Sequence, residues 1–122
     1  MRDRDRQILV KILKYCDEVI IANELYHSDK ELFEDVKQGF VYKNYVCMSI
    51  LQIGELSKNL SEDFARQYPG IPLKVMARMR DILAHHYGGI NTNITFSTAT
   101  KDVPEVKKQV SAILAECGIE TE

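Results

Sequence analysis

The 122-residue sequence is poor in several residue types, and these shortages exclude whole classes of protein. It has no tryptophan, three prolines and six glycines, and no apolar run reaches the length of about 18 residues that a membrane-spanning helix needs. Its three cysteines, Cys16, Cys47 and Cys117, form no C-x-x-C pair and no metal-ligand spacing, so neither a disulfide framework nor a metal site is expected. Scattered thiols of odd number are typical of a reducing cytoplasm, and the charged start MRDRDRQ lacks the apolar segment of a signal peptide.

Charge of either sign is not in large excess. The 16 basic and 18 acidic residues give a net charge of -2, which argues against a generally basic nucleic-acid-binding protein. A local basic cleft stays open, because a binding partner responds to the local field as well as to the total charge. The composition is otherwise that of one soluble globular domain, here residues 1–122.

Because prolines and glycines are few, long segments keep an apolar period near 3.6 residues, which predicts helices. We expect helices over residues 4–26, 28–39, 40–60, 61–68, 72–87 and 102–117. Residues 88–100 could form a loop or a short strand, and a loop is favoured because a single strand needs a partner. Ser28 opens a capping-box pattern, Ser61 caps a short helix, and Gly88 or Gly89 should end the fifth helix in the left-handed conformation. The predicted fold class is an all-α, up-and-down bundle of four long helices with one or two short ones.

Two neighbouring residues are unusual for the centre of the 40–60 helix. Gly54 lowers helix propensity by about 1 kcal/mol relative to alanine, so we expect another helix to cross closely there. Glu55 lies on a helix that is apolar almost all round, and a buried carboxylate needs a partner. We expect an arginine across the bundle or across a dimer, with either a structural or a site-supporting role.

The stretch RMRDILAHHYGG, residues 78–89, gathers most of the candidate site residues. At 100° per residue, His86 falls in the core-facing stripe, so a core or interface histidine is expected. Tyr87 falls almost above Arg80, two turns away. The opposite face carries three ionisable side chains: Arg78, Asp81 and His85.

Arg80 and His85 are not neighbours on a regular helix, because about 140° separates them. A joint site needs either a helix that loosens before Gly88 or a second copy of the chain packed across a two-fold axis. Such a site would suit metal-free RNA cleavage: His85 can deprotonate a ribose 2′-OH, and Arg80 can stabilise charge on the attacked phosphate. Nearby side chains that could support substrate binding are Lys74, Arg78, Asp81, His86 and Glu55.

Three motifs occur in order: I-G-E at residues 53–55, Y-P-x-I-P at 68–72, and R-x-x-x-x-H-x-Y formed by Arg80, His85 and Tyr87. The series resembles the HEPN superfamily, and in particular the HepT toxins of prokaryotic MntA–HepT toxin–antitoxin pairs. The segment RDRQILVKILKYCDEV also resembles the first helix of that family. One departure is Asp81, since the family often has asparagine after the motif arginine.

The resemblance implies a homodimer, or a higher oligomer, with a composite active site at the subunit interface. It implies a metal-independent RNA endonuclease without a cofactor, in which Arg80 and His85 are the catalytic pair. It also implies a partner, a minimal nucleotidyltransferase antitoxin that transfers AMP from ATP to Tyr87 in a type VII toxin–antitoxin system. The added negative charge and bulk beside Arg80 would then repel an RNA phosphate.

Two other interpretations remain open at this point. The chain could be a non-catalytic helical scaffold for a nucleotidyltransferase, in which Arg80 holds a nucleotide phosphate. Alternatively, Arg80 and His85 could be surface residues that compensate the helix dipole, without binding or catalysis.

Overall fold

The structure is a computed structural model that describes residues 1–118, and in this part of the chain every regular element is helical. The elements are α1 (Asp3–Leu25), α2 (Lys30–Glu34), α3 (Phe40–Lys58), α4 (Glu62–Gln67), α5 (Leu73–His86), η1 (Tyr87–Gly89), α6 (Thr92–Ser97), η2 (Thr98–Asp102) and α7 (Val103–Glu116). The predicted all-α bundle is therefore confirmed. None of the helices among these residues is long and apolar enough to cross a membrane.

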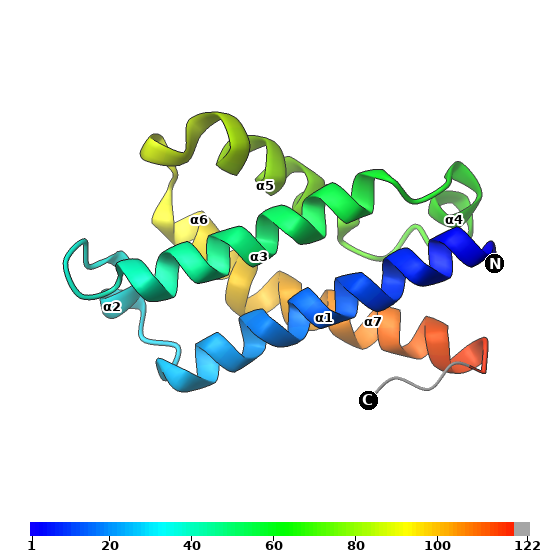
Figure 1. Cartoon of the computed structure of the whole chain (residues 1–122), viewed down its shortest axis with the longest axis horizontal. Helices are drawn as coiled ribbons and strands as arrows, with labels where there is room; N and C mark the ends of the chain where they lie inside the picture. The colour runs from blue at the N-terminus through cyan, green and yellow to red at the C-terminus, as the bar shows by residue number, and fades with distance from the viewer. Residues whose placement is uncertain (119–122) are drawn as a thin grey trace.

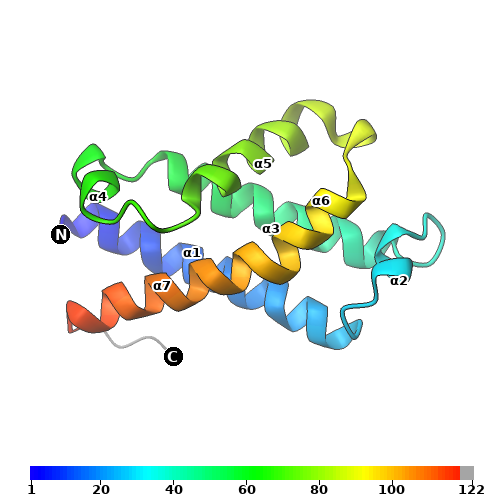
Figure 2. The same ribbon diagram turned by 180° about the vertical axis from the view of Figure 1, so that it is seen from behind.

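The long helices pack around α1 and α3, which lie side by side in opposite directions (Figure 1). Helix α5 packs on α3, and α7 packs on α1. Seen from behind, α6 and α7 form one long rod across the bundle, so the four long helices are α1, α3, α5 and the rod (Figure 2). The interior is filled by fully buried side chains from these helices and from α2, including Leu9, Ile12, Val19, Phe33, Tyr42, Val46, Ile50, Ile53, Met76, Val103, Val106 and Leu114.

Gly54 lies where α3 and α5 cross, as its place in an apolar helix predicted. A Cβ added to it would come closer than 3.0 Å to the Cβ of Arg80 and to the carbonyl oxygen of Met76. Only a residue without a side chain lets the two helices approach to this distance. The same contact fixes Arg80 of α5 against the turn of α3 that carries Glu55.

Two predicted features of the second helix are wrong. His27 and Ser28 have positive φ values of 58° and 46°, and the Ser28 N–H donates to the Asn23 carbonyl oxygen at 2.7 Å. Ser28 thus belongs to the turn that closes α1, and Asp29 is the residue that caps α2 by accepting from the Leu32 N–H. Helix α2 ends at Glu34, short of the predicted Gly39.

The predicted loop over residues 88–100 is also wrong, because most of it is helical. Asn91 caps α6 by accepting from the Ile94 N–H. Hydroxyls of Thr95, Thr98 and Thr100 donate to carbonyl oxygens four residues earlier, so these β-branched residues satisfy their own polar groups inside a helix. No glycine ends α5 in the left-handed conformation; Gly88 and Gly89 instead form the 3-10 turn η1 after His86.

The π-helical segment η2 joins α6 to α7 without a break. The Val103 N–H donates to the Thr98 carbonyl oxygen, five residues earlier. In that pattern the next donor would be residue 104, which is proline and has no N–H. The Ala99 carbonyl oxygen accepts instead from the buried amide of Asn23 at 3.1 Å, and the Asn23 side-chain oxygen accepts from the Tyr42 hydroxyl at 2.6 Å.

Candidate active site

Arg80 is held against α3 by a partly exposed ion pair with Glu55, whose side chain is 46% exposed. The Arg80 Nε lies 2.6 Å from the Oε2 of Glu55, and the Arg80 side chain is 27% exposed. The N–H does not point along this line, so the contact is an ion pair without an aligned hydrogen bond. The prediction that Glu55 pairs with an arginine across the bundle is confirmed, and the arginine is the candidate catalytic residue itself.

The ion pair extends into a chain of four alternating charges. A terminal nitrogen of Arg80 lies 3.2 Å from Asp81 Oδ1, which also accepts from Lys58. The Lys58 hydrogen bond, with help from Arg80, holds the pKa of the Asp81 carboxyl below its usual value. Asp81 therefore carries a negative charge at neutral pH, and Arg80 lies between two carboxylates.

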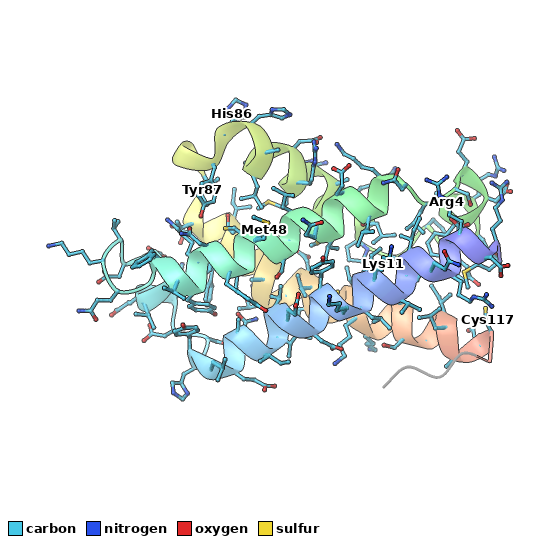
Figure 3. All side chains as sticks on the ribbon, in the orientation of Figure 1. Arg4, Lys11, Met48, His86, Tyr87 and Cys117 are labelled. Carbon is cyan, nitrogen blue, oxygen red and sulfur yellow. The ribbon has the colours of Figure 1, made fainter. Side chains whose placement is uncertain are left out.

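His85 and His86 are both exposed at the C-terminal end of α5. A core position for His86 is wrong for this chain, because its side chain is exposed at the residue where α5 ends. The other half of the expectation, an interface histidine, stays a prediction. Figure 3 shows His86 directed away from α3. Helix α5 stays regular from Leu73 to His86, so it does not loosen to bring His85 toward Arg80.

Tyr87 lies beyond the end of α5 and points back toward α3 (Figure 3). Its hydroxyl donates to the side-chain oxygen of Asn44, and Lys43 lies over its ring, 5.9 Å from the centroid. Partial burial, and next the neighbouring Cys47, raise the pKa of the Tyr87 hydroxyl. The side chain is thus tethered to the first half of α3 and stays protonated at neutral pH.

The sequence placed Tyr87 almost above Arg80 and two turns away, and both side chains contact α3, but at positions far apart. Tyr87 contacts Asn44, whereas Arg80 contacts Glu55, eleven residues further along α3. At 1.5 Å per residue the two contact points lie about 16 Å apart along the helix axis. An AMP group on Tyr87 would therefore lie first beside Lys43 and not on the Arg80 guanidinium of the same chain.

The remaining predicted site residues lie at two separate hollows. Lys74 is exposed at the edge of an apolar cavity of about 420 Å³ formed by the end of α3, α4 and the start of α5. Arg78 is exposed and lines a second hollow between α5 and the α6–η2 segment. In residues 1–118 no three histidine, cysteine or acidic side chains come together as metal ligands.

The sequence did not identify the residues of α3 that hold these side chains. Asn44, Cys47 and Lys58 contact Tyr87 or Asp81, yet each reads in the sequence as an ordinary helical residue. The available signal is their spacing, since residues 44, 47, 51, 55 and 58 recur on one face of α3. That spacing identifies a face but not the helix that will pack on it.

Comparison with known proteins identifies the family to which the chain is similar. Residues 7–113 match the family described as "Ribonuclease HepT-like". The chain is 44% identical over 118 residues to "Putative RNase MJ0127" of Methanocaldococcus jannaschii, covering 96% of this chain and 93% of the relative. It is 36% identical over 86 residues to "Probable ribonuclease HepT" of Thermococcus cleftensis, covering 63% and 78%. No solved structure gives a significant match. The chain thus belongs to the HepT-like ribonuclease family.

Proposed function

We propose that the protein is a metal-independent RNA endonuclease in which Arg80 and His85 act together. His85 takes the proton of a ribose 2′-OH, the oxygen attacks the adjacent phosphorus, and the bond to the 5′-oxygen of the next nucleotide breaks. The 5′-oxygen takes a proton from solvent water, and His85 returns its proton to solvent. Arg80 stabilises the added negative charge of the pentacoordinate phosphate. The products are a 2′,3′-cyclic phosphate and a free 5′-OH, and in the proposed mechanism the proton transfer and the charge stabilisation are both carried out by side chains.

The observation that carries this proposal is the regular course of α5 through His86. It leaves Arg80 against α3 and His85 in solvent on a different face, so one chain does not bring them together. Because the helix does not loosen, a second copy packed across a two-fold axis is the remaining way to bring an arginine and a histidine together. The active unit is accordingly a homodimer in which Arg80 of one subunit works with His85 of the other.

Mixing two inactive variants tests this pairing directly. Arg80→Ala and His85→Ala homodimers should each lose RNA cleavage. Co-refolding the two variants produces heterodimers. If the site is shared between subunits, each heterodimer has one intact Arg80–His85 pair, and its activity should be about half of the parent's. No recovery in heterodimers of confirmed composition would overturn the shared site, and full activity of His85→Ala would overturn the mechanism.

We further propose that the chain is the toxin of a type VII toxin–antitoxin pair and acts in the cytoplasm. A nucleotidyltransferase antitoxin would transfer AMP to Tyr87: the hydroxyl oxygen attacks the α-phosphorus of ATP and pyrophosphate leaves. Because the pKa of Tyr87 is raised, the partner must supply the base that takes its proton. Co-expression with the partner should add the mass of AMP to the parent and none to Tyr87→Phe.

A second function is favoured by one observation, the two carboxylates around Arg80. Glu55 and Asp81 reduce the positive potential at the guanidinium, which would suit a scaffold that binds a nucleotidyltransferase and does not cleave RNA. Tight complex formation together with no cleavage by the isolated parent would establish this alternative. Increased cleavage in Asp81→Asn would instead favour the ribonuclease.

A further inference from the structure

The hollow between α5 and the α6–η2 segment is a groove of about 410 Å³ that the catalytic pair does not use. We call it the α5–α6 groove. Its apolar side is formed by Val75, Met79 and Ile82 of α5. Its polar side is formed by Asn93, Ser97 and Thr98, and the two helices that flank it are seen in Figure 2.

Two opposite charges line this groove without pairing. Arg78 of α5 and Asp102 at the end of η2 are both lining residues, yet within residues 1–118 neither forms an ion pair. By contrast, Arg80 and Lys58 on the other side of α5 are both paired. A partly buried carboxylate and a free guanidinium in one groove suit a ligand that carries both hydrogen-bond donors and an anionic group.

The groove leads toward the candidate base of the reaction. Arg78 and His85 are seven residues apart on a regular helix, so they share a face to within about 20° and lie about 10 Å apart along the axis. Ile82 lies between them and lines the groove. A strand of RNA that places one phosphate at Arg78 would therefore reach His85 a short distance further on.

We propose that the α5–α6 groove binds the nucleobase next to the cleaved phosphate and prefers guanine. The apolar side chains of α5 would contact the base face, as in other single-strand sites. Guanine offers two adjacent donors, N1–H and N2–H, which match the two oxygens of one carboxylate, here Asp102. Its O6 accepts a hydrogen bond, which the Asn93 amide can donate, whereas no other RNA base combines these three groups.

This inference rests on the proposed ribonuclease activity, and it is tested by binding so that the two can fail separately. The probe is a set of short single-stranded RNAs that differ at one position, titrated by fluorescence anisotropy onto dimers of the non-cleaving His85→Ala variant. We expect the guanine-containing RNA to bind about tenfold or more tightly than the others. Asp102→Asn in the same background should abolish that preference.

A second variant and a matched control separate base recognition from charge. Arg78→Gln should weaken all the RNAs about equally and reduce the slope of log Kd against log salt by about one. Lys101→Gln removes an exposed neighbouring charge that does not line the groove, and it should change neither property beyond a small salt effect. Circular dichroism of each variant verifies that the helices are kept.

Three results would overturn the proposal. The first is an unchanged guanine preference in Asp102→Asn, even when Arg80→Ala and His85→Ala abolish cleavage; the proposed function would then stand alone. The second concerns Ile94, which lines the groove and is exposed: dissociation of the dimer by Ile94→Glu with no change in RNA binding would make the groove a contact between copies of the chain. The third is no RNA binding by His85→Ala, which overturns base binding in the groove. If the parent also does not cleave RNA, the proposed ribonuclease activity is overturned as well.

Discussion

Replacing Gly54 by alanine should destabilise the protein, although the same change at an ordinary helical position stabilises. Alanine improves helix propensity by about 1 kcal/mol. Against this, the new Cβ would lie below 3.0 Å from Arg80 Cβ and the Met76 carbonyl oxygen, and 3.1 Å from the Met76 carbonyl carbon. Because two of these atoms are backbone, no side-chain rotation relieves the overlap, and α5 must move away from α3.

The size of the effect follows from these opposing terms. Overpacking of a tight helix crossing costs typically about 1–3 kcal/mol, and the backbone contact places Gly54→Ala toward the upper end. After the gain in propensity, the net loss is about 1–2 kcal/mol. For a domain of this length that corresponds to a decrease in Tm of roughly 3–8 °C.

Urea unfolding followed by circular dichroism measures this loss. Gly88→Ala is the matched control, because a Cβ there meets no atom within 4 Å, and its unfolding free energy should change by no more than about 0.5 kcal/mol. Since Arg80 lies at the crossing, Gly54→Ala should also lower RNA cleavage more than the stability loss explains. An equal or higher urea midpoint for Gly54→Ala would refute the account of the crossing.

Three further changes test other parts of the structure. Asn23→Leu should cost about 2–4 kcal/mol in thermal unfolding, because it leaves the Tyr42 hydroxyl and the Ala99 carbonyl without partners, whereas Tyr42→Phe should cost less. The lowered pKa of Asp81 stabilises the fold above its ordinary value of about 4, and this stability is lost as the pH falls through the folded-state pKa; Asp81→Asn should therefore flatten the decrease of Tm in acid. Of the three thiols, exposed Cys117 should react with Ellman's reagent in the native protein, while burial raises the pKa of Cys16 to about 12 and of Cys47 to about 11 and should delay both until unfolding. Three fast-reacting thiols in the folded state would contradict the burial.

Sequence alone predicted the parts of the fold that depend on local pattern. Apolar periodicity located α1, α3, α5 and α7 within a few residues, and Ser61 caps α4 as expected, accepting from the Phe64 N–H. The same hydroxyl donates to the buried carboxylate of Asp5, which no local rule indicates. Helix α6 was missed because asparagine and threonine are weak helix formers, and its place depends on packing such as Phe96 against Phe33.

In the candidate site, too, local pattern was predictable from the sequence and contacts between helices were not. A helical projection correctly separated Arg80 from His85, and the apolar sequence around Glu55 indicated that this carboxylate has a partner. It could not predict that Tyr87 turns back onto Asn44 or that Lys58 meets Asp81, because those contacts depend on where α5 crosses α3. The groove residues Asn93 and Ser97 were missed with α6 itself, since a segment predicted as a loop has no defined face, and Asp102 was predicted only as the first residue of the last helix.

The π-turn of η2 has a consequence for comparing this chain with its relatives. A π-turn holds one more residue than the α-helical turn it replaces, while the helices on either side keep their faces. A relative with a regular helix here would lack one residue between positions 98 and 102 and still present the equivalents of Asn93 and Ser97 to the groove. A one-residue gap at this point in an alignment would therefore mark the loss of the Asn23–Ala99 bond, not a shift of register. Substituting the π-turn with a regular helix of unchanged length would instead rotate α6 by about 100° and remove its side chains from the groove.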